Sequence, residues 1–414
     1  SFDNNHFIKE VINKAFSSVK ETLIFDMQSS VTNPDYPTAD HIHYQNPGEI
    51  LDFALSLTPY VTIKHDYMPN PAREFLIILN HKSRWFLNYD FYDRHWDMKN
   101  IEILDCTLRD GSYITNFQFS KRDTKNIVSG LDKSGVNFIE VGHGLGLGAS
   151  SPKLGIAYET DCEYINVAKQ SAPNRLIGSF CIPGIGSKKD IRESVKAGLD
   201  FIRIGVNVDE ISDAEEFVKL SYDLGLQVHL NLMKTYAFDP KILAPEVKKL
   251  KKWPLDVIYV VDSAGSMLPK DTTDYVTMLK NNTSFDVGFH GHNNLGIANA
   301  NCIAAADAGA RFVDGTLLGI GRSAGNAQLE VIAWIIQQSG YRTNIDCISL
   351  FDVAERWVMP LMPKAQGLMP IDVTIGMSKF HTSFMPRLKR ALDKYDVDLK
   401  KLIVEVSKKD YINP

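Results

Sequence analysis

The most regular pattern of apolar and polar positions lies between residues 101 and 340, where short apolar runs alternate with segments of helical length. Four passages repeat one order: a polar segment, a glycine and a short apolar run. They are 133–140, 196–203, 223–229 and 307–314. Because glycine readily takes the left-handed conformation that ends a helix, each passage predicts a helix end followed by a buried strand.

Four further apolar runs complete the pattern. They are 101–104, 176–182, 257–261 and 287–290. Eight strands that alternate with helices predict an α/β fold, and they favour a (β/α)₈ TIM barrel over a doubly wound sheet. In such barrels the chemistry lies at the carboxyl ends of the strands, so polar residues that follow a strand become the candidate functional residues.

The segments on either side of this region have a different pattern of apolar and polar positions. Residues 1–97 show helical spacing at 7–23 and 48–57 and two β-rich runs within 75–92, which predicts a small α+β domain of unknown role. The barrel is then expected to span 98–340.

A helical C-terminal region, 341–414, is expected after the barrel and is expected to contribute to the active site. Amphipathic spacing marks three helices in it, at 348–359, 384–395 and 399–406.

Composition excludes several classes of protein. Hydrophobic residues make up 44% and charged residues 23%, as in ordinary globular proteins. A net charge of −5 gives no electrostatic case for nucleic-acid binding. No apolar run approaches the ~18 residues of a membrane span, and the first residues do not resemble a secretory signal. The five cysteines include no CxxC pair, which predicts reduced thiols and a cytoplasmic location.

One carboxylate and two histidines follow predicted strands. Arg109 and Asp110 come after the run that begins at Ile101, and His290 and His292 end the run that begins at Val287. Alternation along a strand puts both imidazoles on the same face. An aspartate and two histidines at strand ends predict a site for a divalent metal with positions left for substrate.

Other polar positions have two readings. The glycine-rich loop 319–326 suits an anionic group at a helix N-terminus, or only closes the barrel. His143 either shapes the pocket or is a structural histidine. Asp262 could orient the metal ligands through hydrogen bonds without binding the metal itself. The hydroxyl of Thr235 could bind a substrate oxygen.

Six motifs in order carry a family resemblance. They lie at 104–112, 140–151, 183–186, 259–267, 290–296 and 319–330. In these motifs the chain resembles the metal-dependent TIM-barrel lyases with an Asp-Arg-Glu type of signature, which are related to hydroxymethylglutaryl-CoA lyase. Within that group it resembles the 4-hydroxy-2-oxovalerate aldolases. The resemblance covers residues 100–408 and leaves out 1–97.

The resemblance implies a reversible cleavage of a 4-hydroxy-2-oxoacid to pyruvate and an aldehyde. It implies that Asp110, His290 and His292 bind Mn²⁺, with Mg²⁺ or Co²⁺ as alternatives, and that Arg109 steadies the pyruvate enolate.

The same resemblance suggests residues for the rest of the substrate. Thr235 falls where the family has a hydroxyl near the substrate carboxylate. Phe180 and Ile182 fall where apolar side chains set aldehyde selectivity.

Two positions depart from the family pattern. Tyr113 stands where the family has its catalytic histidine, and His381 stands where it has a pocket tyrosine. Our hypothesis is that the two groups have exchanged places, with His381 as the base and Tyr113 orienting the proton path or serving as the acid. A tyrosine at the first position also resembles aldolase-like proteins of surface-sugar synthesis, so a sugar-derived aldehyde is an alternative substrate.

Rival functions are weighed against the same motifs. The related acyl-CoA synthases carry Glu-Gln where Ser112 and Tyr113 stand, and the acyl-CoA lyase carries a cysteine in the loop that corresponds to 319–326. A non-enzymatic assembly role is disfavoured by the intact set of candidate ligands. Related aldolases pair with an aldehyde dehydrogenase, so such a partner or a homo-oligomer is an expectation.

Overall fold

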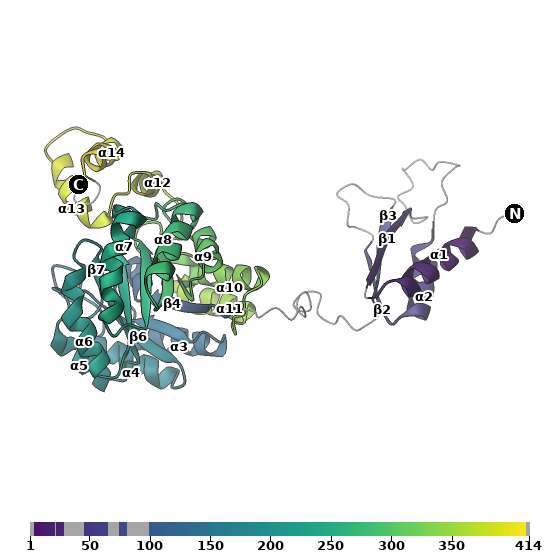
Figure 1. The fold of residues 1–414 in the computed structure, drawn as a ribbon, viewed down its shortest axis with the longest axis horizontal. Coiled ribbons are helices and arrows are strands. Elements are labelled where there is room, and N and C mark those ends of the chain that lie inside the picture. The colour runs from purple at the N-terminus through teal and green to yellow at the C-terminus, as the bar shows by residue number, and fades with distance from the viewer. Residues whose placement is uncertain (1–3, 21, 29–44, 65–73, 81–98, 411–414) are drawn as a thin grey trace. The chain divides into compact units, whose positions relative to one another are not determined.

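The computed structural model describes residues 4–20, 22–28, 45–64, 74–80 and 99–410. The chain divides into two compact units, Ser1–Trp96 and Asp97–Pro414 (Figure 1). In the described part of the chain, no helix is both long enough and apolar enough to cross a membrane.

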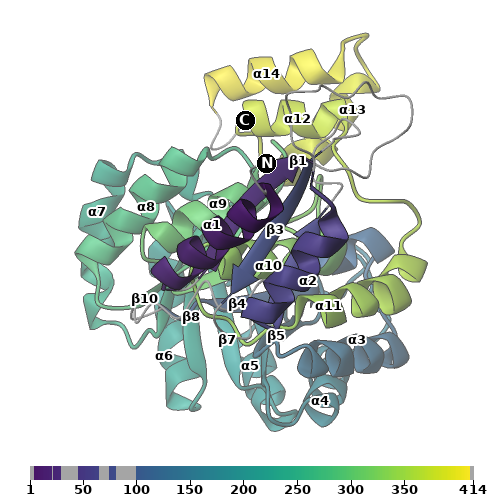
Figure 2. The same ribbon diagram turned by 90° about the vertical axis from the view of Figure 1, so that its right-hand side faces the viewer.

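The first unit is a small α+β domain. Its elements are α1 (Asn4–Ser18), β1 (Thr22–Gln28), α2 (Pro47–Leu57), β2 (Tyr60–Lys64) and β3 (Glu74–Asn80). The strands form an antiparallel sheet in the order β1-β3-β2. Both helices cover one face of this sheet (Figure 1, Figure 2). Apolar residues of α1, α2 and β3 form a core of their own.

The sequence pattern was wrong in part of this unit. The helix predicted over 7–23 ends at Ser18, and Leu23 lies in β1. The run Phe25–Gln28 alternates apolar and polar residues, the period of a strand, and the pairing of β1 with β3 decides the outcome. Neither β1 nor β2 was expected, whereas α2 and β3 were. The second β-rich run lies outside the described residues.

The second unit contains the predicted TIM barrel. Its strands are β4 (Glu102–Leu108), β5 (Phe138–Val141), β6 (Leu176–Cys181), β7 (Phe201–Asn207), β8 (Gln227–Met233), β9 (Val257–Asp262), β10 (Asp286–Gly291) and β11 (Phe312–Gly315). They pair in parallel, and β9 meets β10 to close the barrel. All eight predicted strands are present, which confirms the fold class.

A helix follows each barrel strand. These helices are α3 (Lys121–Lys133), α4 (Asp161–Ser171), α5 (Lys188–Lys196), α6 (Glu215–Asp223), α7 (Pro240–Lys249), α8 (Pro269–Asn282), α9 (Ala298–Asp307) and α10 (Leu329–Gln338). The four glycines of the repeated passages have φ values from 79° to 105°, the left-handed conformation that the pattern predicted: Gly135, Gly198, Gly225 and Gly309.

Two layers of side chains fill the barrel below the strand ends. An aromatic layer from alternating strands contains Phe138, Phe201, Tyr259 and Phe312, with His229 stacked among the rings. Above it lies a layer of buried charges, described with the site below. Because the interior is filled, the barrel offers a rigid floor to its carboxyl end.

The C-terminal region is helical, as expected. It contains α11 (Cys347–Val353), which runs into a π-helical turn (Ala354–Val358), then α12 (Pro370–Met377), α13 (Met385–Leu392) and α14 (Leu399–Lys409). The pattern missed α12. The helices α12, α13 and α14 gather together at one end of the barrel and share a small core (Figure 1).

Candidate active site

The candidate metal ligands lie far apart in the sequence and meet at the carboxyl end of the barrel. Asp110 opens a 3₁₀ turn (Asp110–Thr115) directly after β4. His290 is on β10, and His292 follows its last residue. Because β4 and β10 both neighbour β11, the three side chains converge.

The geometry of these three side chains fits a divalent cation. The Oδ2 atom of Asp110 lies 3.7 Å from Nε2 of His290 and 4.0 Å from Nε2 of His292. The three ligand atoms lie within 4.8 Å of one another, and all three residues are buried. This Oδ2 atom has no hydrogen-bond partner among the described residues. A buried carboxylate oxygen without a partner, facing two imidazole nitrogens, is a set of donors that a metal would satisfy.

Electrostatics keep Asp110 ionised. Burial works against the charge, but Arg109 and the two histidines hold the pKa of Asp110 below its usual range. Burial also lowers the pKa of His292 to about 3. Both groups are therefore in the protonation state that binds a metal at neutral pH.

Each histidine is oriented by a partner on its other ring nitrogen. The Nδ1 atom of His290 is 2.8 Å from Oδ2 of Asp314, and Nδ1 of His292 is 3.3 Å from the carbonyl oxygen of Gly325. Because both partners accept hydrogen bonds, each Nδ1 carries the proton and each Nε2 keeps a lone pair for a ligand bond.

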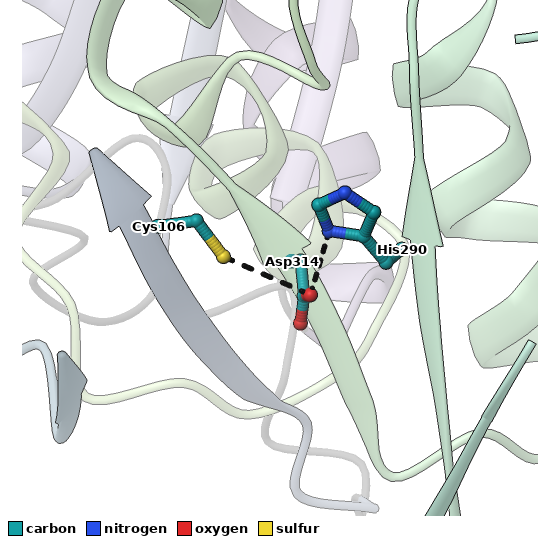
Figure 3. A group of neighbouring side chains, drawn as sticks. All are labelled: Cys106, His290 and Asp314. Carbon is teal, nitrogen blue, oxygen red and sulfur yellow. Dashed lines mark hydrogen bonds and ion pairs between the residues drawn. The ribbon is translucent and has the colours of Figure 1, made fainter. Parts of the chain in front are cut away.

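Asp314 is the centre of a second buried cluster of side chains. Figure 3 shows Cys106 from β4 and His290 from β10 both directed at its carboxylate, with Cys106 Sγ 3.8 Å from Oδ2. Burial raises the pKa of the Cys106 thiol well above its ordinary value, so the thiol keeps its proton. Arg203 also bonds to this carboxylate. The cysteine, histidine and arginine partners therefore all contact Oδ2 of Asp314.

A chain of ion pairs continues from Asp314 to Arg109. Arg203 is fully buried and donates to both Asp314 and Glu140, the latter at 3.1 Å. The Nε atom of Arg109 donates to the same Oε2 of Glu140 at 2.8 Å, and its Nη1 lies 3.2 Å from Asp110. This network fixes the guanidinium of Arg109 beside the candidate metal ligands.

Asp314→Asn is expected to weaken Mn²⁺ binding about 10-fold to 100-fold, because the neutral amide no longer fixes the proton on Nδ1 of His290. Isothermal titration with Mn²⁺ measures the change. Cys106→Ser alters the same cluster without touching a ligand and is expected to change affinity by less than about threefold. Equal affinities for the wild type and Asp314→Asn would contradict the orienting role.

A cavity of about 230 Å³ opens above these groups. Eight of the ten residues predicted for the site line it: Arg109, Asp110, Tyr113, Phe180, Ile182, His290, His292 and His381. Phe180 packs against Arg109, with the guanidinium carbon 4.8 Å from the ring centroid. The roles of these residues stay predictions, but the structure brings them into one pocket.

Thr235 and His143 do not line this cavity. The hydroxyl of Thr235 donates to the Leu232 carbonyl at 2.5 Å and accepts from the amide of Val261 at 3.0 Å, so the backbone uses it. His143 stacks on Phe117 with ring centroids 3.8 Å apart. Both side chains were expected to contact the substrate, but in the structure neither of them lines the cavity.

The carboxylate of Asp262 is also placed differently from the expectation. It accepts the amides of Ser266 and Met267 at 2.9 and 2.8 Å and so closes its own loop. Only its backbone carbonyl reaches a ligand residue, by accepting the amide of His292.

Sequence reasoning missed several residues of the site. Arg322, in the glycine-rich loop, lines the cavity and lies between Tyr113 and His381. Lys234 lines it from the end of β8. A signal for the buried network was available. Glu140, Arg203 and Asp314 occupy the same last position in three of the repeated passages, and alternate barrel strands contribute to the same interior layer.

Comparison with known proteins places the chain in a family. The sequence pattern of the HMGL-like family matches residues 100–356. The 4-hydroxy-2-oxovalerate aldolase 2 of Rhodococcus opacus is 39% identical over 314 residues, which cover 76% of this chain and 90% of that protein. The 4-hydroxy-2-oxovalerate aldolase of Chloroflexus aurantiacus is 38% identical over 315 residues, with 76% and 92% covered.

Solved structures agree on the fold. The N-terminal domain of a suspected aldolase from Bacteroides vulgatus has a TM-score of 0.61 at 23% identity, with 69% of this chain and 96% of that chain covered. The carboxyl transferase domain of Rhizobium etli pyruvate carboxylase has a TM-score of 0.61 at 18% identity, with 75% and 56% covered. By the match to the family pattern and the identity to these aldolases, the chain belongs to the HMGL-like family, as its six motifs predicted.

Proposed function

We propose that this protein is a divalent-metal-dependent pyruvate aldolase, which reversibly cleaves a 4-hydroxy-2-oxoacid to pyruvate and an aldehyde. The observation that carries the proposal is the convergence of Asp110, His290 and His292 beside Arg109 in one pocket. The identity to proteins named 4-hydroxy-2-oxovalerate aldolase supports the same reaction.

Asp110, His290 and His292 would hold the cation, for which Mn²⁺ is our first choice and Mg²⁺ and Co²⁺ are the alternatives. A bound divalent ion supplies Lewis-acid stabilisation to the oxygens of the oxoacid. Arg109 presents a fixed positive charge to the negative charge that develops on the pyruvate oxygen. Its ion pairs with Glu140 and Asp110 hold it in position before substrate arrives.

Tyr113 and His381 are the groups proposed to move protons. Burial raises the pKa of Tyr113, so its phenol stays protonated and serves as the donor. Burial and the neighbouring cations hold the pKa of His381 well below its ordinary value, so the ring is neutral and accepts a proton. A base with a depressed pKa is also a weaker base.

Phe180 and Ile182 form the apolar side of the pocket, where the aldehyde is proposed to lie. Their side chains limit the water that reaches the reacting carbon.

Exchange of the pyruvate methyl protons tests the pyruvate half of the reaction without knowledge of the aldehyde. Incubation with pyruvate and Mn²⁺ in D₂O is expected to cause loss of the methyl signal in proton NMR. A chelator is expected to stop the exchange, and parallel samples with Mg²⁺ and Co²⁺ rank the metals. Absence of exchange while Mn²⁺ is demonstrably bound would refute the proposal and favour acyl-CoA chemistry.

A further inference from the structure

Arg322 is a cation that lines the pocket, and the proposed reaction assigns it no role. Its Nη2 atom lies 3.1 Å from Nε2 of His381 and 3.5 Å from the carbonyl oxygen of Ser263. Its guanidinium carbon lies 6.0 Å from the ring centroid of Tyr113. None of these partners carries a negative charge. Because a guanidinium only donates, Nε2 of His381 is the acceptor and the ring is neutral.

The other two arginines of the site are neutralised, whereas Arg322 is not. Arg109 pairs with Asp110 and Glu140, and Arg203 pairs with Glu140 and Asp314. Among residues 99–410, no carboxylate lies within ion-pairing distance of Arg322. A half-buried guanidinium that points into a cavity without a counter-ion is suited to an anionic ligand.

Lys234 brings a second cation to the same side of the pocket. It is 7% exposed, lines the cavity, and has its Nζ atom 5.1 Å from the ring centroid of Phe384. Its backbone has a φ of 56°, which is uncommon for a residue other than glycine, and its amide donates to Oγ of Ser263 at 3.0 Å. This turn directs the end of β8 toward the pocket.

Both cations act on the same ring. After burial, the charges of Arg322 and Lys234 are the largest influences that lower the pKa of His381. Of the charged residues that line the cavity, Arg109, Lys234 and Arg322 are cations and Asp110 is an anion. In the proposed reaction, Arg109 and the metal act on the pyruvate part of the substrate. Arg322 and Lys234 are then the cations left for the aldehyde part.

We propose that Arg322 and Lys234, which lie beside His381, form a lobe of the pocket that binds an anionic group, a carboxylate or a phosphate, on the far end of the aldehyde. The inference rests on the proposed aldolase activity and names the class of its second substrate. The hydroxyl of Ser383, which also lines the cavity, supplies a further donor to this lobe.

The reaction itself stays an aldol addition. The pyruvate methyl carbon loses a proton and forms a bond to the aldehyde carbon, and the aldehyde oxygen gains a proton. Nothing is oxidised or reduced, and no further reactant is required. In the cleavage direction the substrate is a 4-hydroxy-2-oxoacid with a second anionic group.

Two matched pairs of aldehydes test the inference in the wild-type protein with Mn²⁺ and pyruvate. One pair is glyceraldehyde 3-phosphate and glyceraldehyde, and the other is succinic semialdehyde and butanal. The ratio of kcat/KM for the anionic member to that for the neutral member is expected to be about tenfold to a hundredfold. The pair with the larger ratio identifies phosphate or carboxylate as the preferred group.

Variants locate the effect. Arg322→Gln and Lys234→Met are each expected to reduce this ratio about tenfold, since each removes one charged hydrogen bond or charge contact to the anion. Arg342→Gln is the matched control. Arg342 is exposed and lines a separate cavity at the amino end of the barrel, so the ratio is expected to stay at the wild-type value.

A binding measurement gives a readout independent of turnover. Isothermal titration is expected to detect glycerol 3-phosphate binding to the wild-type protein and weaker binding to Arg322→Gln, with no binding of glycerol.

The outcomes separate the two proposals. Pyruvate exchange together with equal or better use of the neutral aldehydes would overturn the anionic subsite and leave the aldolase intact. A preference that Arg322→Gln and Lys234→Met both retain would also overturn it. Absence of pyruvate exchange with Mn²⁺ bound would overturn the aldolase proposal and, with it, the inference.

Discussion

Asp110→Asn is expected to reduce metal-dependent exchange of the pyruvate methyl protons at least about 1000-fold. The substitution keeps the shape of the side chain but removes the charge that faces His290 and His292. Mutation of a residue that only hydrogen-bonds to a metal ligand typically costs about 10-fold to 100-fold in metal affinity. Loss of the charge of a ligand itself is therefore expected to weaken Mn²⁺ binding by more than about 100-fold. The two measurements are proton NMR in D₂O and titration with Mn²⁺.

Asp286→Asn is the control for this variant. Asp286 begins β10, the strand that carries His290, and its side chain is exposed at the other end of that strand. The control removes an equal charge and is expected to leave both measurements unchanged. If Asp110→Asn bound Mn²⁺ as tightly as the wild type, the assignment of this ligand set would be wrong.

Arg203→Met is expected to produce the largest loss of stability. Arg203 is fully buried and pairs with Glu140 and Asp314, and its guanidinium carbon lies 4.4 Å from the ring centroid of Tyr259. Without it, two carboxylates remain in the barrel interior with too little positive charge. Removal of one partner from a buried ion pair typically costs about 3–5 kcal/mol. Urea unfolding of the protein, followed by circular dichroism, measures the loss.

Arg175→Met provides a matched comparison. Arg175 pairs with Asp132 at 2.6 Å, but both side chains keep about a third of their surface exposed. Solvent screens such a pair, so its loss is expected to cost at most about 1 kcal/mol. If Arg203→Met lost no more stability than Arg175→Met, Arg203 would not be the group that stabilises the buried carboxylates.

The barrel was predictable because its determinants are local. Each strand is an apolar run, and four of the turns before a strand depend on a glycine with positive φ that follows a helix. Once the strands are assigned, parallel topology places every carboxyl end at one face. That rule predicts that Asp110, His290 and His292 lie together at this face.

The surroundings of these ligands were less accessible to prediction. Glu140, Arg203 and Asp314 each end an apolar run, and the partners of Arg203 lie 63 and 111 residues away in sequence. The contact between Arg322 and His381 spans 59 residues. Thr235 shows the opposite case, because a hydroxyl near a strand end satisfies either a substrate or the backbone, and here it bonds to the backbone.

The order of residues therefore established the α/β barrel, the face that carries the chemistry and the set of candidate metal ligands, since these follow from periodicity and chain direction. The spatial arrangement established which charges pair with one another, that Asp314 contacts His290, and that Arg322 lines the pocket. Electrostatic interactions depend on distance and burial, and both are properties of the folded chain rather than of neighbouring positions in the sequence.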